Sequence, residues 1–127
     1  MSPEIISRYF KEIESEVQKM ENAYIERYEE EILTAHRANL RIRIRFVSGN
    51  LLELNEAVSV EDRNLKHLGY RYHFQDVKNN LVFRYDNAPH FPEIDSFPHH
   101  KHLPDTVRSL EKPSIIDVIK EVSDYEY

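Results

Sequence analysis

Apolar residues near the start of the chain recur at steps of three and four residues. Between Pro3 and about Glu21 these positions are Ile6, Phe10, Ile13, Val17 and Met20. That spacing gathers them on one face of an α-helix. The pattern therefore predicts an amphipathic N-terminal helix.

The next segment, Tyr24–Leu33, fits two structures. Tyr24, Tyr28 and Ile32 continue the helical spacing. A break at Asn22 and the strand preference of tyrosine and isoleucine favour an edge strand instead. We expect a strand here, with a continuing helix as the alternative.

Four later segments alternate apolar and polar residues, which is the period of a half-buried strand. They are Leu40–Phe46, Leu51–Val60, Tyr70–Gln75 and Leu81–Asp86. Gly49-Asn50 lies between the first two segments and Asp76–Asn80 between the last two, where hairpin turns are expected. Because short turns join strands that pair with each other, the segments are predicted to form an antiparallel meander.

The last apolar stretch begins after Pro113. Ser114 and Asp117 stand three residues apart there, as in the capping box that opens many helices. The whole pattern predicts an α+β fold in a single domain over residues 1–127. Its parts are an N-terminal helix, an antiparallel sheet of four or five strands in a meander, a His/Pro-rich loop and a short C-terminal helix.

Alternation also sorts the strand residues onto two faces of the predicted sheet. We expect the helices to cover the apolar face, formed by Ile42, Ile44, Phe46, Leu52, Leu54, Tyr70, Tyr72, Phe74, Leu81, Phe83 and Tyr85. The other face carries Arg41, Arg43, Arg45, Glu53, Asn55, Arg71, His73, Gln75, Arg84 and Asp86. This polar face fits either a solvated surface with cross-strand ion pairs or a binding site.

The tract Pro89–Pro104 is the most unusual part of the chain. Its prolines restrict the backbone, and it holds four of the seven histidines: His90, His99, His100 and His102. Imidazole titrates near neutral pH and, as the neutral ring, is the commonest metal ligand. The tract therefore indicates proton transfer, phosphate contact or metal binding.

Composition narrows the chemistry. No cysteine occurs, so thiol catalysis, disulfides and cysteine–zinc sites are excluded. The two glycines are too few for phosphate-cradling loops. A net charge of -6 disfavours indiscriminate binding to nucleic acid but allows a local basic patch. Without a signal peptide or a membrane-spanning apolar run, the protein is expected to be soluble, cytoplasmic and free of the membrane.

The polar side chains match the needs of RNA cleavage without a metal ion. Such cleavage requires a base for the 2′-hydroxyl proton, an acid for the leaving oxygen and cations for the phosphate. The predicted catalytic residues are His73, Arg84, Asp86, His90 and His100. The predicted substrate-binding residues are Arg41, Arg43, Gln75, Asn87 and Lys101. This hypothesis needs no cofactor.

The same histidines also suit a metal site. Nitrogen ligands for zinc, nickel or manganese would come from His90, His99, His100 and His102, with Asp86 as an oxygen ligand. Their spacing matches no specific metal motif. A non-catalytic module that binds a protein or a metal ion is therefore the alternative to a ribonuclease.

Three motifs carry a resemblance to a known family. They are Tyr70-x-Tyr-His-Phe-Gln75, Leu81-x-Phe-Arg-Tyr-Asp-Asn-Ala-Pro-His90 and Phe97-Pro-His-His-Lys-His102. In this order, and followed by a helix that begins at Pro-Ser, they resemble the TumE-like toxins of prokaryotic toxin–antitoxin systems. The resemblance spans about Leu40–Glu121. Phe91 departs from it, because a second histidine is expected after His90 in many relatives.

The resemblance implies a growth-inhibiting toxin with a cognate antitoxin protein as its partner. It does not supply a mechanism. The motif residues carried over are Tyr72, His73, Gln75, Arg84, Asp86, Asn87, Pro89, His90, His99, His100 and His102. RNA as a target follows from the side-chain chemistry, and the open edges of the predicted sheet would allow a homodimer.

Overall fold

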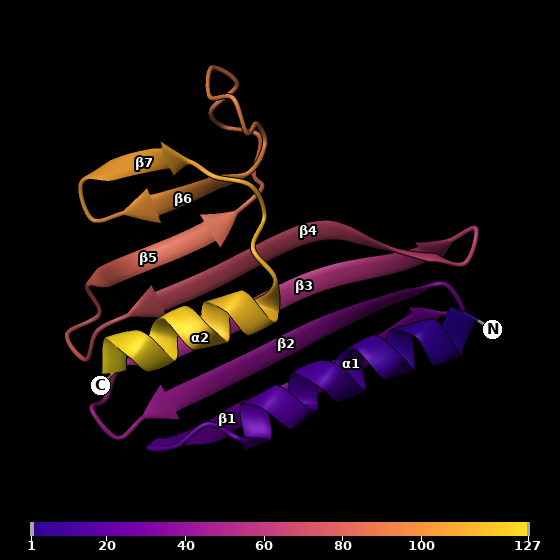
Figure 1. The fold of residues 1–127 in the computed structure, drawn as a ribbon, viewed down its shortest axis with the longest axis horizontal. Coiled ribbons are helices and arrows are strands. Elements are labelled where there is room, and N and C mark those ends of the chain that lie inside the picture. The colour runs from indigo at the N-terminus through magenta and orange to yellow at the C-terminus, as the bar shows by residue number, and fades with distance from the viewer. Residues whose placement is uncertain (1, 127) are drawn as a thin grey trace.

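The computed structural model describes residues 2–126, with side chains from residue 4 onward. Within that range the chain forms two helices, α1 (Ser2–Gln18) and α2 (Ile115–Glu126), and seven strands. The strands are β1 (Ala23–Thr34), β2 (Arg37–Phe46), β3 (Leu51–Glu61), β4 (Asn64–Gln75), β5 (Leu81–Asp86), β6 (His100–Leu103) and β7 (Thr106–Ser109). Figure 1 shows the strands side by side as one sheet, with the two ends of the chain at α1 and α2.

The sheet is a simple antiparallel meander in the order β1-β2-β3-β4-β5-β6-β7. Each strand pairs with the strand that follows it, through short turns everywhere except between β5 and β6, which the longer loop of residues 87–99 joins. Asp62 and Arg63, with φ of 50° and 64°, form the turn between β3 and β4. These two residues are the whole connection, because β3 ends at Glu61 and β4 begins at Asn64.

The predicted sheet of four or five strands is corrected to seven. Strands β6 and β7 lie in and after the tract that was expected to be a His/Pro-rich loop, which is reduced to residues 87–99. Each of the two has only four residues. Such a length is too short for alternation to be recognised, so pairing with β5 decides the structure. The predicted strand at Tyr24–Leu33 is confirmed as part of β1, after a break at Asn22 with a φ of 57°.

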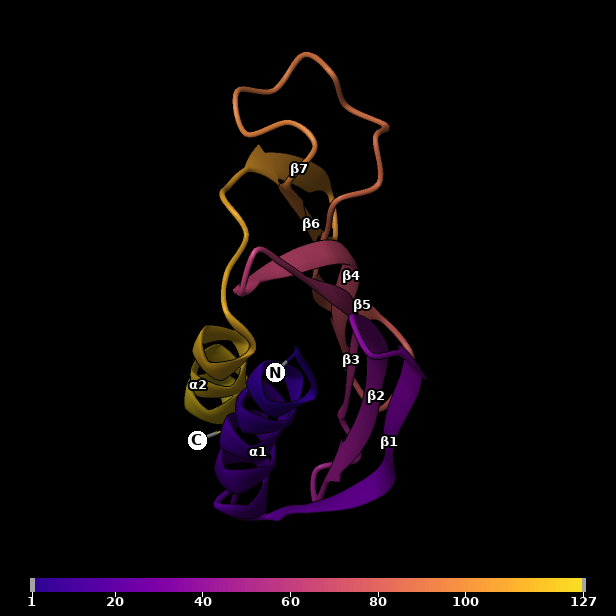
Figure 2. The ribbon, with the colours of Figure 1, turned by 90° about the vertical axis from the view of Figure 1, so that its right-hand side faces the viewer.

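Both helices pack on the same face of the sheet (Figure 2). The helix residues buried there are Ile6, Phe10, Ile13, Val17, Ile115, Val118, Ile119 and Val122. Opposite them lie the predicted apolar strand residues, of which Tyr72, Phe74, Leu52 and Leu54 are fully buried. The predicted packing role of the tyrosines on this face is therefore confirmed.

The predicted start of the last helix is also confirmed. The amide of Asp117 donates to Ser114 Oγ at 3.0 Å, and the amide of Ser114 donates to Asp117 Oδ2 at 3.3 Å. This reciprocal pair satisfies two backbone groups that a helix start leaves open. Neither helix described is long and apolar enough to cross a membrane.

Candidate functional site

Polar side chains of five neighbouring strands line one groove on the sheet face that the helices leave open. This polar-face groove has a volume of about 720 Å³. It is lined by Asn39, Leu40, Arg41, Asn55, Glu56, Ala57, Gly69, Tyr70, Arg71, Arg84, Asp86, Asn87, Ala88, His90, Phe91 and His102. Strands β2 to β6 and the loop after β5 therefore meet at a single site.

Strand register explains why these residues meet. Arg41 pairs with Asn55, Asn55 with Arg71, Arg71 with Asp86, and Asp86 with His100. Directly paired residues of antiparallel strands point to the same face. The five residues thus form one row across the sheet.

The sheet is irregular at the floor of the groove. A register shift follows Glu56 in the pairing of β3 with β4. Beyond the end of β5, the side chain of Asn87 forms hydrogen bonds to the backbone of β4. Its Oδ1 accepts from the Tyr70 amide at 3.1 Å, and its Nδ2 donates to the Leu68 carbonyl at 3.0 Å. A Cβ built on Gly69 would meet no atom within 4 Å, so the groove is open above this backbone.

Three guanidinium groups give the groove a local positive charge. Arg84 Nε donates to Asp86 Oδ2 at 3.2 Å. Arg41 and Arg71 are exposed and have no hydrogen-bond or ion-pair partner among the described side chains. The carboxylate of Glu56 is fully buried on the helix side, which leaves Asp86 as the groove's own negative charge. A basic patch therefore exists on a chain whose net charge is -6.

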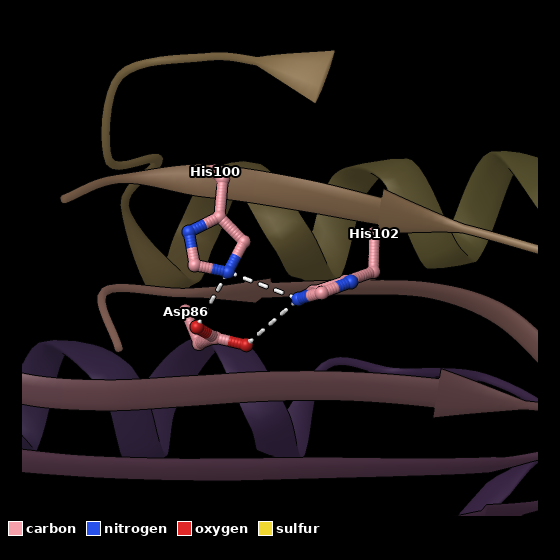
Figure 3. Close-up of side chains that lie close together, drawn as sticks. All are labelled: Asp86, His100 and His102. Atoms are coloured by element: carbon pink, nitrogen blue, oxygen red, sulfur yellow. Dashed lines mark hydrogen bonds and ion pairs between the residues drawn. The ribbon is translucent and has the colours of Figure 1, made fainter. Parts of the chain in front are cut away.

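Asp86 and two histidines form a tight cluster at one end of the groove (Figure 3). His100 Nε2 lies 2.8 Å from Asp86 Oδ1 and 2.9 Å from His102 Nε2. His102 Nε2 lies 3.6 Å from Asp86 Oδ2. Both rings project from β6 towards Asp86 on β5, because His100 and His102 are two residues apart and share one face.

Burial separates the two rings of this cluster. His100 is 1% exposed, whereas the side chain of His102 is 18% exposed and lines the groove. Burial, followed by the positive charge of Arg84, lowers the pKa of His102 below its ordinary value. Phe91 packs its ring against both imidazoles, with centroids 5.0 Å and 5.7 Å away. The cluster is therefore enclosed on one side and open to the groove on the other.

The structure brings together some of the predicted site residues. Arg41, Arg84, Asp86, Asn87 and His90 line the groove, and His100 contacts Asp86 from beneath it. His90 is exposed, at the start of the loop that follows β5.

Other predicted residues lie on the same sheet face but outside the groove. His73 Nε2 is bonded to Gln75 Oε1 at 2.9 Å, and burial lowers the pKa of the His73 ring. Arg43 is held by Glu26 at 2.8 Å and by Glu53 at 3.5 Å. The Arg43 contacts are the cross-strand pairs that the solvated-surface interpretation of the polar face expected, whereas His73 and Gln75 both belong to β4.

Two further predicted residues lie on the helix side of the sheet. Lys101 Nζ is 2.6 Å from a carboxylate oxygen of Glu121 in α2. His99 Nδ1 is 2.9 Å from the Tyr70 hydroxyl, and its ring stacks on Tyr70. Neither residue lines the groove.

Sequence reasoning missed several residues. Arg71 and Asn55 were assigned to the correct face but not to the site, because only the register places them beside Asp86. Glu56 continues the inward alternation of Leu52 and Leu54. An acidic residue at an inward position predicts a buried carboxylate, so the sequence already contained a signal for Glu56.

The fold and the groove define a small α+β meander protein with an arginine-lined groove on its open face. A comparison with protein-family models matches residues 10–126 to the family described as Toxin TumE. The chain belongs to this toxin family, and a cognate antitoxin is the partner that membership implies. No curated protein and no solved structure shows significant similarity to it.

The family match confirms the resemblance found in the motifs and extends it. It begins at residue 10, within α1, rather than near Leu40. Much of the N-terminal helix is therefore part of the family region.

Proposed function

We propose that this toxin inhibits growth by cleaving RNA, with the scissile phosphate bound in the polar-face groove. One observation carries the proposal: Arg41, Arg71 and Arg84 come from three strands to the same groove that exposes His90 and His102. Cationic clamps and imidazoles in one site are what phosphodiester cleavage needs.

The arginines would hold the phosphate. A guanidinium group binds phosphate through two parallel hydrogen bonds. Arg41 and Arg71 have no competing partner among the described side chains, and Arg84 is oriented by Asp86. The groove can thus offer a backbone phosphate three guanidinium groups, of which Arg41 and Arg71 are unpaired among the described side chains and Arg84 is held in place by Asp86.

The imidazoles that line the groove would move the protons. In this mechanism one ring takes the proton of the 2′-hydroxyl, whose oxygen forms a bond to phosphorus. The bond from phosphorus to the 5′-oxygen breaks, and the second ring gives a proton to that oxygen. We assign these two roles to His102 and His90, which line the groove, with Asp86 and buried His100 as positioning residues for His102. No metal ion enters this scheme.

This assignment modifies the one made from sequence. His102 takes the role given to His73, because His73 is bonded to Gln75 outside the groove. Arg71 takes the phosphate-binding role given to Lys101, which is paired with Glu121 on the other face.

The test is cleavage of total cellular RNA by the purified full chain, with and without a chelator. Arg84→Ala is expected to lose cleavage, whereas the matched control Arg108→Ala, an exposed arginine of β7 outside the groove, is expected to keep it. Cleavage in the presence of chelator supports the metal-independent scheme. Intact RNA in every reaction would reject the proposal in favour of a non-catalytic binding module.

A further inference from the structure

The Asp86–His100–His102 cluster has an unusual arrangement of hydrogen-bond acceptors. Two imidazole Nε2 atoms and a carboxylate oxygen converge, and all lie within 4.8 Å of one another. Figure 3 shows both rings turned with these nitrogens towards the carboxylate. The closest separations are 2.8 Å and 2.9 Å, both of them to His100 Nε2.

Proton positions at His100 are constrained by its second nitrogen. His100 Nδ1 is 2.9 Å from the carbonyl oxygen of Pro98, which can only accept, so Nδ1 carries a proton. In the neutral ring, Nε2 then presents a lone pair to Asp86 and to His102.

A single proton does not satisfy all three contacts. On His100 Nε2 it forms a straight hydrogen bond to Asp86 or to His102, not to both. On His102 Nε2 it leaves the lone pair of His100 facing the carboxylate. A positive ion bound by the two Nε2 atoms and an Asp86 carboxylate oxygen would accept an electron pair from all three.

We propose that Asp86, His100 and His102 bind a divalent transition-metal ion of the zinc class. Neutral imidazole nitrogens and a carboxylate oxygen are typical zinc ligands. Ligands about 2.0–2.1 Å from a tetrahedral ion lie about 3.3 Å apart. The two Nε2 atoms are 2.9 Å apart, and they lie 2.8 Å from Asp86 Oδ1 and 3.6 Å from Asp86 Oδ2, respectively, so these separations fall on both sides of that value.

The surroundings support this ligand set. The bond from His100 Nδ1 to Pro98 orients Nε2 towards the site, as outer contacts of metal-binding histidines commonly do. Asp86 Oδ1 also accepts from the Ala88 amide at 3.0 Å, which fixes the carboxylate. The two nitrogen ligands disfavour Mg²⁺ and Ca²⁺, which need several oxygen ligands.

The proposed ligands differ from those suggested by the spacing of histidines in the sequence. His99 stacks on Tyr70 on the helix side of the sheet. His90 is exposed at the groove and lies outside the cluster of converging ligand atoms. Of the ligands suggested by the sequence, His100, His102 and Asp86 therefore remain.

The site does not depend on RNA cleavage, but it affects the proposed mechanism. A metal ion would occupy the Nε2 lone pair of His102, one of the two rings proposed to move protons. Metal binding and metal-independent cleavage therefore exclude each other at this ring, and the metal-loaded protein is expected to be inactive.

The experiment is a Co²⁺ titration of the full chain, free of any histidine tag and first stripped with a chelator. We expect the visible absorption of low-coordinate Co²⁺ at one ion per chain, displacement by Zn²⁺, and a rise in melting temperature with Zn²⁺. His102→Gln and Asp86→Asn are expected to weaken binding about 10–100-fold or more. Melting curves of the apo variants verify that they are folded.

Control variants decide between ligand sets. His36→Gln changes an exposed histidine of the turn between β1 and β2, and it should bind like the parent chain. His99→Gln should also keep the site, because its ring lies on the other sheet face. Absence of the Co²⁺ band and of the melting shift in the parent chain would overturn the proposal, as would equal losses in His99→Gln and His102→Gln.

An RNA cleavage assay on the same samples separates the two proposals. Inhibition by stoichiometric Zn²⁺ supports both of them. Cleavage that requires Zn²⁺ supports the metal site and overturns the metal-independent mechanism. Cleavage that is unaffected, in a chain that binds no metal, overturns the metal site alone.

Discussion

Two buried carboxylates on opposite faces of the same sheet have opposite surroundings. Glu56, on the helix side, accepts from the hydroxyls of Tyr9 and Tyr72 and lies 2.7 Å from His67 and 3.3 Å from Lys112. Every one of these neighbours can donate a hydrogen bond. The carboxylate is fully enclosed and satisfied.

Asp86, on the open side, has a mixed set of neighbours. The Ala88 amide and Arg84 donate to it, but His100 and His102 bring lone pairs as well as protons. Its side chain is 10% exposed and it lines the groove. The comparison teaches that the buried Glu56 carboxylate is surrounded by donors alone, whereas Asp86 also faces imidazole nitrogens, the arrangement on which the proposed metal site rests.

The Glu56 cluster joins distant parts of the chain. Tyr9 comes from α1, Tyr72 and His67 from β4, and Lys112 from the segment before α2. Burial alone raises the pKa of the Glu56 carboxyl, but the His67 hydrogen bond, the Lys112 charge and the Tyr9 hydroxyl outweigh burial and lower the pKa. The charged form is thus favoured in the folded protein.

The largest effect is expected from changing Asp86. Asp86→Asn keeps the shape but removes the charge that positions Arg84, His100 and His102, so RNA cleavage should fall about 10²–10³-fold. The free energy of unfolding should fall by only about 1–2 kcal/mol, since the amide retains part of the hydrogen bonding. Single-turnover cleavage and urea unfolding measure the two quantities. Unchanged cleavage would remove Asp86 from the site.

Glu56 should show the reverse behaviour. Glu56→Gln leaves Lys112, whose side chain is 16% exposed, without its counter-charge. Breaking such a pair is expected to lower the free energy of unfolding by about 3–5 kcal/mol. Below the melting temperature, cleavage per folded molecule should stay within a few fold of the parent chain. A parent-like stability would show that Glu56 does not hold the helices to the sheet.

The pH dependence of stability sharpens the same contrast. Because the pKa of Glu56 is lowered from 4.5 in the folded state, its charge stabilises the fold above that pH, and the stabilisation is lost as the pH falls through the folded-state pKa. The stability difference between the parent chain and Glu56→Gln should therefore shrink on acidification. Urea unfolding across acidic pH measures it, with Glu61→Gln, an exposed residue at the end of β3, as the control. A difference that grows on acidification would contradict the lowered pKa.

The smallest effect is expected at Lys101. Its ion pair with Glu121 is partly exposed, and its ammonium lies 4.9 Å from the ring centroids of Phe83 and Tyr85. Lys101→Ala should lower the free energy of unfolding by about 1 kcal/mol. A loss of cleavage far beyond the change in folded fraction would restore the phosphate-binding role predicted from sequence.

Particular elements show where sequence reasoning succeeded. The alternation from Leu40 to Phe46 correctly assigned each residue to a face, because the two-residue period of a strand is local. The pair Ser114 and Asp117 correctly marked the start of α2, because a capping box also depends only on residues close together in the chain. Lys101 was misplaced because β6 was expected to be a loop, to which no alternation applies.

The amino-acid sequence by itself determined the two helices, the long strands, the polar and apolar faces and the family. Each depends on local periodicity, capping or a contiguous motif. Only the tertiary structure decided that Arg41, Asn55, Arg71, Asp86 and His100 form one row. Strand register depends on turn lengths and on irregular pairing such as the shift after Glu56, and these set contacts between residues far apart in the chain.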